Sequence, residues 1–116
     1  PAEGTRAARA DRRLMQTEFR PESLELAQAF EQHARARGMS PTQLAIAWVL
    51  NNRLVNGVIA GPKTLAQWQD YLAAMSCTLT DEDEAFINAK VPAGYASTHG
   101  YNDPIYPIVG RVPRHR

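Results

Sequence analysis

The residues best suited to chemistry lie in the stretch Gly57–Tyr71. A short β-branched run meets a break at Gly61 and Pro62, and a helical pattern begins near Leu65. The first N–H groups of a helix have no backbone partner, so a strand-to-helix turn of this kind can bind an anion. Lys63 adds a positive charge in that turn. The residues predict phosphate binding there, or alternatively an ordinary strand-to-helix connection with an exposed lysine.

The other polar residues suggest no second site. The three histidines and Cys77 lack the spacing of metal ligands, so we expect no metal site. A single cysteine excludes an internal disulfide. His33 lies late in a helical pattern, close to Arg35 and Arg37, and is expected to be exposed. Trp48 and Trp68 have apolar neighbours at helical spacing and are expected to be buried.

Four helices should position the Gly61–Lys63 turn. Gly38 ends the first of them, Ser40 caps the second, and Thr80 with Asp83 forms a capping box for the fourth. Residues 1–13 show no apolar period and are expected to form a loop, with helix from Asp11 onward. Apolar periodicity places the four helices at Pro21–Arg37, Pro41–Asn51, Leu65–Met75 and Asp81–Lys90.

One strand is expected, at residues 56–60. Its run Val58, Ile59 and Ala60 does not alternate with polar residues, which suits a strand buried on both faces of a parallel sheet. A lone strand leaves its N–H and C=O groups unpaired, and the chain offers no partner strand. The pattern therefore indicates part of something larger, either a fragment or a chain whose remainder is separate.

Composition agrees with a globular chain. The 116 residues carry a net charge of +1 and are 44% hydrophobic and 22% charged. Residues 1–20 hold five arginines against Glu3, Asp11 and Glu18, which is too mild an excess for a nucleic-acid footprint. No apolar membrane span or signal peptide is visible, so we expect a cytoplasmic protein with no nucleic-acid or membrane partner.

These segments together resemble the C-terminal third of the aldo-keto reductase family. Gly61, Gln67 and Asp70 match a strand-ending Gly and a Gln-x-x-Glu-Asn helix of the branch that holds potassium-channel β-subunits and bacterial NADP-dependent aldehyde reductases. Tyr71 departs from the asparagine of that pattern. Ser40-Pro-Thr-Gln-Leu-Ala-Ile-Ala-Trp-Val-Leu50 is similar to the preceding family helix, and Gly100–Arg111 resembles the tail of one bacterial subgroup.

The resemblance implies an α/β fold, the C-terminal segment of a (β/α)8 TIM barrel of about 250 residues or more. Taken alone, the segment would be mostly helical with one strand. It would form a single unit, 1–116. Residues 1–20 would be the loop after strand seven, residues 21–91 the helices and last strand, and residues 92–116 an extended tail.

The resemblance also assigns the cofactor NADP, whose adenosine 2′-phosphate would lie at the Gly61 turn. Arg6, in Gly4-Thr5-Arg6-Ala7, matches an arginine that reaches the pyrophosphate. No catalytic residue is expected here, because the family's Tyr, Lys, Asp and His come from earlier strands. The residues expected to contact the cofactor are Arg6, Gly61, Pro62, Lys63, Thr64, Gln67, Asp70 and Tyr71.

The function implied is NADP-dependent reduction of an aldehyde or ketone, with the adenosine end of the cofactor site supplied by this segment. Its partners would be NADP(H), a small carbonyl substrate and the remainder of the barrel. Two alternatives stay open. One is a non-catalytic nucleotide-binding relative such as a channel β-subunit, and the other is a small helical interaction module.

Overall fold

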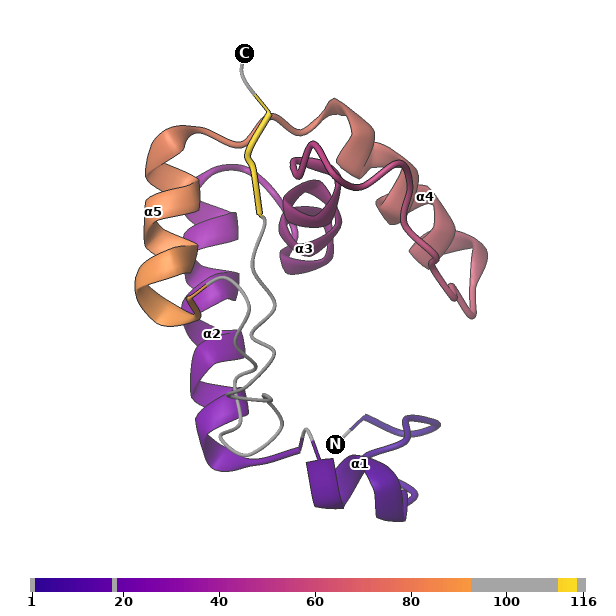
Figure 1. Cartoon of the computed structure of the whole chain (residues 1–116). Helices are drawn as coiled ribbons and strands as arrows, with labels where there is room; N and C mark the ends of the chain where they lie inside the picture. Colours follow the sequence, from indigo (N-terminus) through magenta and orange to yellow (C-terminus); the bar gives the residue numbers. More distant parts are fainter. Residues whose placement is uncertain (1, 18, 93–110, 115–116) are drawn as a thin grey trace.

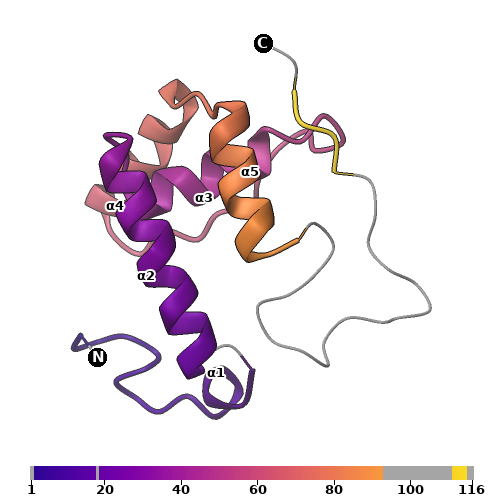
Figure 2. The same cartoon turned by 90° about the vertical axis from the view of Figure 1, so that its left-hand side faces the viewer.

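The computed structural model describes residues 2–17, 19–92 and 111–114. Helix α2 is the long axis, α5 lies beside one end of it, and α3 and α4 follow across that end (Figures 1 and 2). Helix α1 lies near the other end of α2. The elements are α1 (Arg12–Thr17), α2 (Pro21–Ala36), α3 (Pro41–Leu50), α4 (Leu65–Ala73), a 3-10 turn η1 (Ala74–Ser76) and α5 (Asp81–Lys90).

Local sequence signals set the ends of these helices, as predicted. Ser40 accepts a hydrogen bond from the Gln43 N–H, and the Gln43 side chain accepts from the Ser40 N–H, which completes a capping box on α3. Helix α2 ends at Ala36 with Arg37 as its C-cap, and Gly38 follows with a left-handed φ of +74°. The Met39 N–H then donates to the Ala34 carbonyl at 2.9 Å, which satisfies an end-of-helix acceptor.

The core lies where α2, α3 and α5 meet. Buried Ala34 of α2, Leu44 of α3 and Ile87 of α5 are each at most 7% exposed. Met39, Ala47 and Leu79 complete the buried cluster, and Phe30, Trp48, Cys77 and Phe86 pack partly buried against it. Helix α3 also packs against α4, the helix that follows the Gly61–Lys63 turn.

The predicted strand at residues 56–60 is not formed. This segment has no strand ladder, and Val58 is 38% and Ile59 102% exposed. The described residues contain one isolated antiparallel bridge, between Asn52 and Pro113, and no sheet. The physical reason is that a ladder needs a neighbouring strand, and these residues supply none. Burial of Trp68 was also predicted wrongly, since Trp68 is 44% exposed.

Each end of the chain is described only in part. Residues 1–20 include the short helix α1 as well as loop, in agreement with helix from Asp11 onward. Most of the predicted extended tail, residues 93–110, lies outside the described residues. Residues 111–114 return to the end of α3. In the described parts of the chain, no helix has the length and apolarity needed to cross a membrane.

Candidate functional site

The turn before α4 is the place where the sequence predicts an anion site. Thr64 is the N-cap of α4, and its hydroxyl oxygen accepts from the Gln67 N–H at 3.2 Å. The Gln67 side-chain oxygen in turn accepts from the N–H groups of Thr64 at 3.2 Å and Lys63 at 2.6 Å. Thr64-x-x-Gln67 is thus a capping box, a sequence signal that the cofactor interpretation of Gln67 overlooked.

Two further donors at this turn face no partner among the described residues. The first two N–H groups of α4, on Leu65 and Ala66, make no hydrogen bond there, and both residues are exposed. The N-terminal end of the helix also carries the positive end of its dipole. The turn therefore combines free backbone donors, a hydroxyl and the Lys63 ammonium around one helix N-terminus. Gly61 and Pro62 lead the chain into this position.

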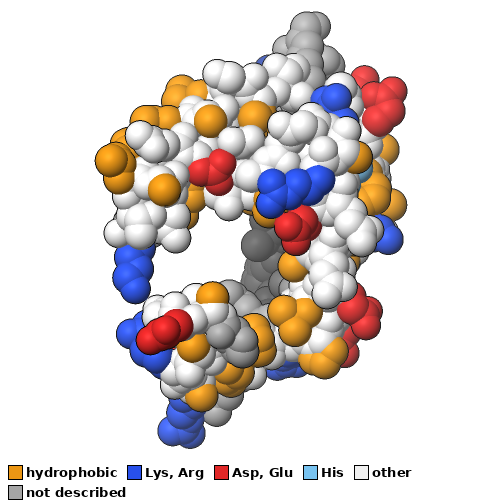
Figure 3. Space-filling view, turned by 180° about the vertical axis from the view of Figure 1, so that it is seen from behind, with side chains coloured by type: hydrophobic (Ala, Val, Ile, Leu, Met, Phe, Trp, Pro, Cys, Tyr) orange, Lys and Arg blue, Asp and Glu red, His pale blue; other side chains and the backbone are white. Residues whose placement is uncertain are grey.

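Lys63 brings the turn before α4 close to the loop that carries Arg6. The Lys63 ammonium donates to the Gly4 carbonyl at 3.4 Å, although 59 positions separate the two residues in the sequence. The space-filling view shows an opening between the part with α1 and the other helices, with basic side chains at its edge (Figure 3). The two segments predicted to contact the cofactor thus meet in the folded chain.

Arg6 lies on this loop with its side chain about half exposed. Its guanidinium donates to the Asp11 carboxylate at 2.9 Å, and the Asp11 carboxylate also accepts from the Leu14 N–H near the start of α1. An anion bound at Arg6 would share the guanidinium with the Asp11 carboxylate. That carboxylate only accepts hydrogen bonds, so it offers the anion no donor. Arg6 is therefore placed near Lys63 by the fold, while its charge is partly used within the loop.

Asp70 makes contacts that the sequence did not reveal. Its carboxylate accepts from the Ser40 hydroxyl at 3.0 and 3.1 Å and from the Gln43 side-chain amide at 2.8 Å. Asp70 thereby ties α4 to the capped N-terminus of α3. These contacts give it a structural role, and its predicted contact with adenine stays a prediction. Tyr71, the next residue, lines a shallow hollow between the start of α3 and residues 58–61.

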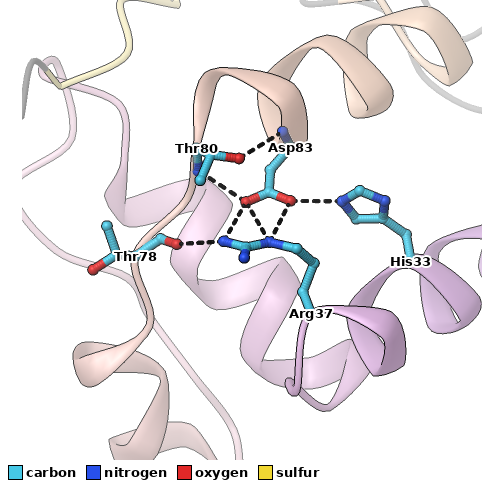
Figure 4. A network of polar contacts seen from close by, with 5 residues as sticks. All are labelled: His33, Arg37, Thr78, Thr80 and Asp83. Carbon is cyan, nitrogen blue, oxygen red and sulfur yellow. Dashed lines mark hydrogen bonds and ion pairs between the residues drawn. The ribbon is translucent and has the colours of Figure 1, made fainter.

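A second polar cluster, around Asp83, also escaped the sequence analysis (Figure 4). Asp83 is 0% exposed, and its ionised carboxylate accepts from His33 Nε2 at 2.7 Å and from Arg37 at 3.0 to 3.2 Å. Thr80 N–H donates to it at 2.8 Å, as the predicted capping box requires. His33 is thus partly buried, contrary to the prediction, and its ring stacks on Phe86.

The environment of Asp83 keeps it charged. Burial alone would raise the pKa of Asp83, but hydrogen bonds from Arg37, from the Thr80 backbone and from His33 outweigh it and hold the pKa well below its usual range. The hydrogen bond to Asp83 and its negative charge raise the pKa of Arg37. This cluster joins α2 to α5 through a buried carboxylate, so we assign it to stability rather than to chemistry. No set of three potential metal ligands occurs among the residues the structure describes.

Comparison with known proteins identifies the family. A sequence profile described as "Aldo/keto reductase family" matches residues 2–92. No match was found among curated proteins or among solved structures. The match includes the Arg6 loop, the turn at Lys63 and all five α-helices, and the family fold is a (β/α)8 barrel whose helices surround parallel strands. The chain therefore belongs to the aldo/keto reductase family.

Proposed function

We propose that the chain supplies the adenosine end of the NADP site in a reductase of aldehydes or ketones. The observation that carries this proposal is the contact of the Lys63 ammonium with the Gly4 carbonyl, beside the N-terminus of α4. This contact brings together the Lys63 turn and the loop that carries Arg6, two segments distant in the sequence. Membership of the family makes a nicotinamide cofactor and a carbonyl substrate the expected ligands.

The donor set fits the 2′-phosphate of NADP. Lys63 provides an ammonium that can pair with a dianion, and the N–H groups of Leu65 and Ala66 provide two directed donors. The Thr64 hydroxyl accepts from Gln67 N–H and keeps its own hydrogen to donate. NAD carries a hydroxyl at this place, which needs no such concentration of positive charge. The donors therefore favour NADP over NAD.

The neighbouring side chains suit the rest of the adenosine moiety and the pyrophosphate. The Gln67 oxygen is occupied by the cap of α4, so its amide nitrogen is the group that would donate to adenine. Asp70 would have to accept from adenine in addition to Ser40 and Gln43. Arg6 would reach the pyrophosphate by sharing its charge with Asp11. Tyr71 would border the site from the hollow beside Gly61.

The chain would complete a barrel rather than act alone. We assign its residues to binding and orienting the cofactor, with the C-terminal third of the barrel as their place. When bound, the cofactor supplies the hydride for carbonyl reduction, and the proton donor would come from the remainder of the barrel. The exposed Val58 and Ile59 are the residues that neighbouring parallel strands would cover.

The test is the affinity of the complete reductase for NADPH and NADH. Replacing Lys63 by Ala should weaken NADPH binding about tenfold to over a hundredfold, the effect of losing a charge-assisted contact of roughly 1.5–3 kcal/mol. NADH binding should change little. Lys90→Ala, which removes the same charge from the far end of α5, should affect neither cofactor. Equal losses for NADPH and NADH in Lys63→Ala would place the phosphate elsewhere.

A further inference from the structure

The last described residues of the chain, Arg111–Arg114, lie on a surface formed by α3, residues 51–55 and the first turn of α5. The Arg111 guanidinium forms a two-pronged ion pair with the Glu84 carboxylate, with Nε to Oε2 at 3.1 Å and NH2 to Oε1 as the second contact. Both side chains are nearly buried, at 8% and 11% exposure. A two-pronged pair of this geometry adds directional hydrogen bonds to the charge attraction, and removing one partner would leave the other charge nearly buried and unpaired.

Other groups complete the environment of Arg111. Its guanidinium lies over the ring of Trp48, 3.9 Å from the ring centre, which adds a cation–π contact. Asn51 donates its side-chain N–H to Glu84 Oε1 at 2.7 Å, so this oxygen accepts from Asn51 as well as from Arg111. A planar guanidinium satisfies the carboxylate and the ring together, which an ammonium could not do equally well.

The backbone of the same segment is also recognised. The Arg53 N–H donates to the Val112 carbonyl, and the Arg114 N–H donates to the Asn51 carbonyl, both at 2.8 Å. The Arg114 guanidinium donates to the carbonyls of Leu50 at 2.9 Å and Val55 at 3.0 Å. Arg114 thus satisfies the carbonyl that α3 leaves unpaired at its last residue.

We infer that this surface is a recognition site for an extended peptide with arginines at positions i and i+3, and that the chain's own residues 111–114 occupy it. Arg111 contributes the buried charge, Arg114 caps α3, and the two backbone bonds fix the register. Because the segment is covalently attached, its effective concentration is of the order of millimolar or more, which keeps free peptides out. This inference does not depend on the cofactor proposal.

The inference is tested on the full chain by amide hydrogen exchange. Arg111→Ala should speed exchange at the N–H of residues 53 and 114 by about tenfold to a hundredfold, because it removes a buried charged contact. The Asn51 N–H, which donates within α3 to Ala47, should keep its rate. Arg53→Ala is the matched control, since it removes a neighbouring charge while keeping the N–H that contacts Val112.

A second measurement adds a peptide in trans to the Arg111→Ala chain. A synthetic peptide of residues 110–116 should restore slow exchange at residue 53, whereas the same peptide with Ala in place of Arg111 should not. Unchanged exchange in Arg111→Ala, or equal effects of the two peptides, would overturn the inference. If Arg111→Ala unfolds the chain, Arg114→Ala decides instead, because it removes only two contacts with main-chain carbonyls and should still speed exchange at residue 53.

Discussion

Replacing Asp83 by Asn tests the polar cluster that joins α2 to α5. The substitution keeps the side-chain shape and removes a charge that is 0% exposed and accepts from three side chains or backbone groups. Loss of a capping-box partner costs about 0.5–2 kcal/mol, and loss of a charged hydrogen bond about 1.5–3 kcal/mol. Arg37 is partly exposed and regains water, so we expect a net loss of roughly 2–4 kcal/mol in the free energy of unfolding.

The assay is urea unfolding followed by circular dichroism at pH 7. In a thermal melt followed by the same signal, at about 4–8 °C per kcal/mol for a domain of this size, the melting temperature should fall by roughly 8–32 °C. Asp81→Asn is the control, because Asp81 lies in the same first turn of α5 but is exposed. It should cost under about 1 kcal/mol, the usual effect of a charge near a helix end. Equal losses in the two variants would refute the role assigned to the Asp83 cluster.

The stability difference between wild type and Asp83→Asn should depend on pH, because the pKa of Asp83 is lowered in the folded state. A carboxylate whose pKa is lower in the folded state stabilises the fold in full when the pH is above its unfolded pKa, about 3.9. The stabilisation is lost progressively as the pH falls below that value. The difference in stability between wild type and Asp83→Asn should therefore be present at pH 5 and narrow below about pH 4. A difference that widens toward acid would contradict the assigned charge state.

Two further substitutions test other joints of the fold by urea unfolding. Asp70→Ala should cost about 1–3 kcal/mol because Ser40 and Gln43 lose their shared acceptor, and a loss of NADPH affinity at unchanged stability would instead favour the adenine contact. Gly38→Ala should cost about 1–2 kcal/mol because φ is +74°, whereas Gly57→Ala, with open space at its Cβ, should be neutral or slightly stabilising; equal effects would argue against backbone strain.

The helices could be predicted from the sequence because their signals are local. Gly38 follows the C-cap of α2, and Ser40 and Thr80 cap α3 and α5, each through groups close by in the sequence. Local signals could not decide whether residues 56–60 form a strand, because a strand needs a partner strand. Local residue preference suggested a strand, and tertiary context decided against it in this chain.

The candidate site was predicted in part for the same reason. The turn at Lys63 is visible in a few consecutive residues, and the structure adds its contact with Gly4, which no local pattern reveals. Asp70 finds its partners about 30 positions away, and Asp83 contacts His33 50 positions away. Pairings at such separations depend on how helices pack, so no local pattern predicts the structural partners of these two carboxylates.

The exposed apolar residues of this helical chain can be understood from the barrel fold of its family. On α4 and η1, Leu65, Trp68, Leu72 and Met75 follow helical spacing and are between 44% and 75% exposed, and Ile59 is wholly exposed. Burying one such side chain is worth about 1.5–3 kcal/mol, so the set leaves a large stabilisation unused in this chain. The strand-like run at residues 58–60 also lacks a partner strand for its backbone N–H and C=O groups. Neighbouring parallel strands would remove both deficits. They would pair with the backbone of residues 58–60 and cover the apolar face of α4. We propose that the missing strand and the exposed helix face have one cause, the absence of neighbouring strands from the described residues, and that the Lys63 turn lies at the edge where such strands would end.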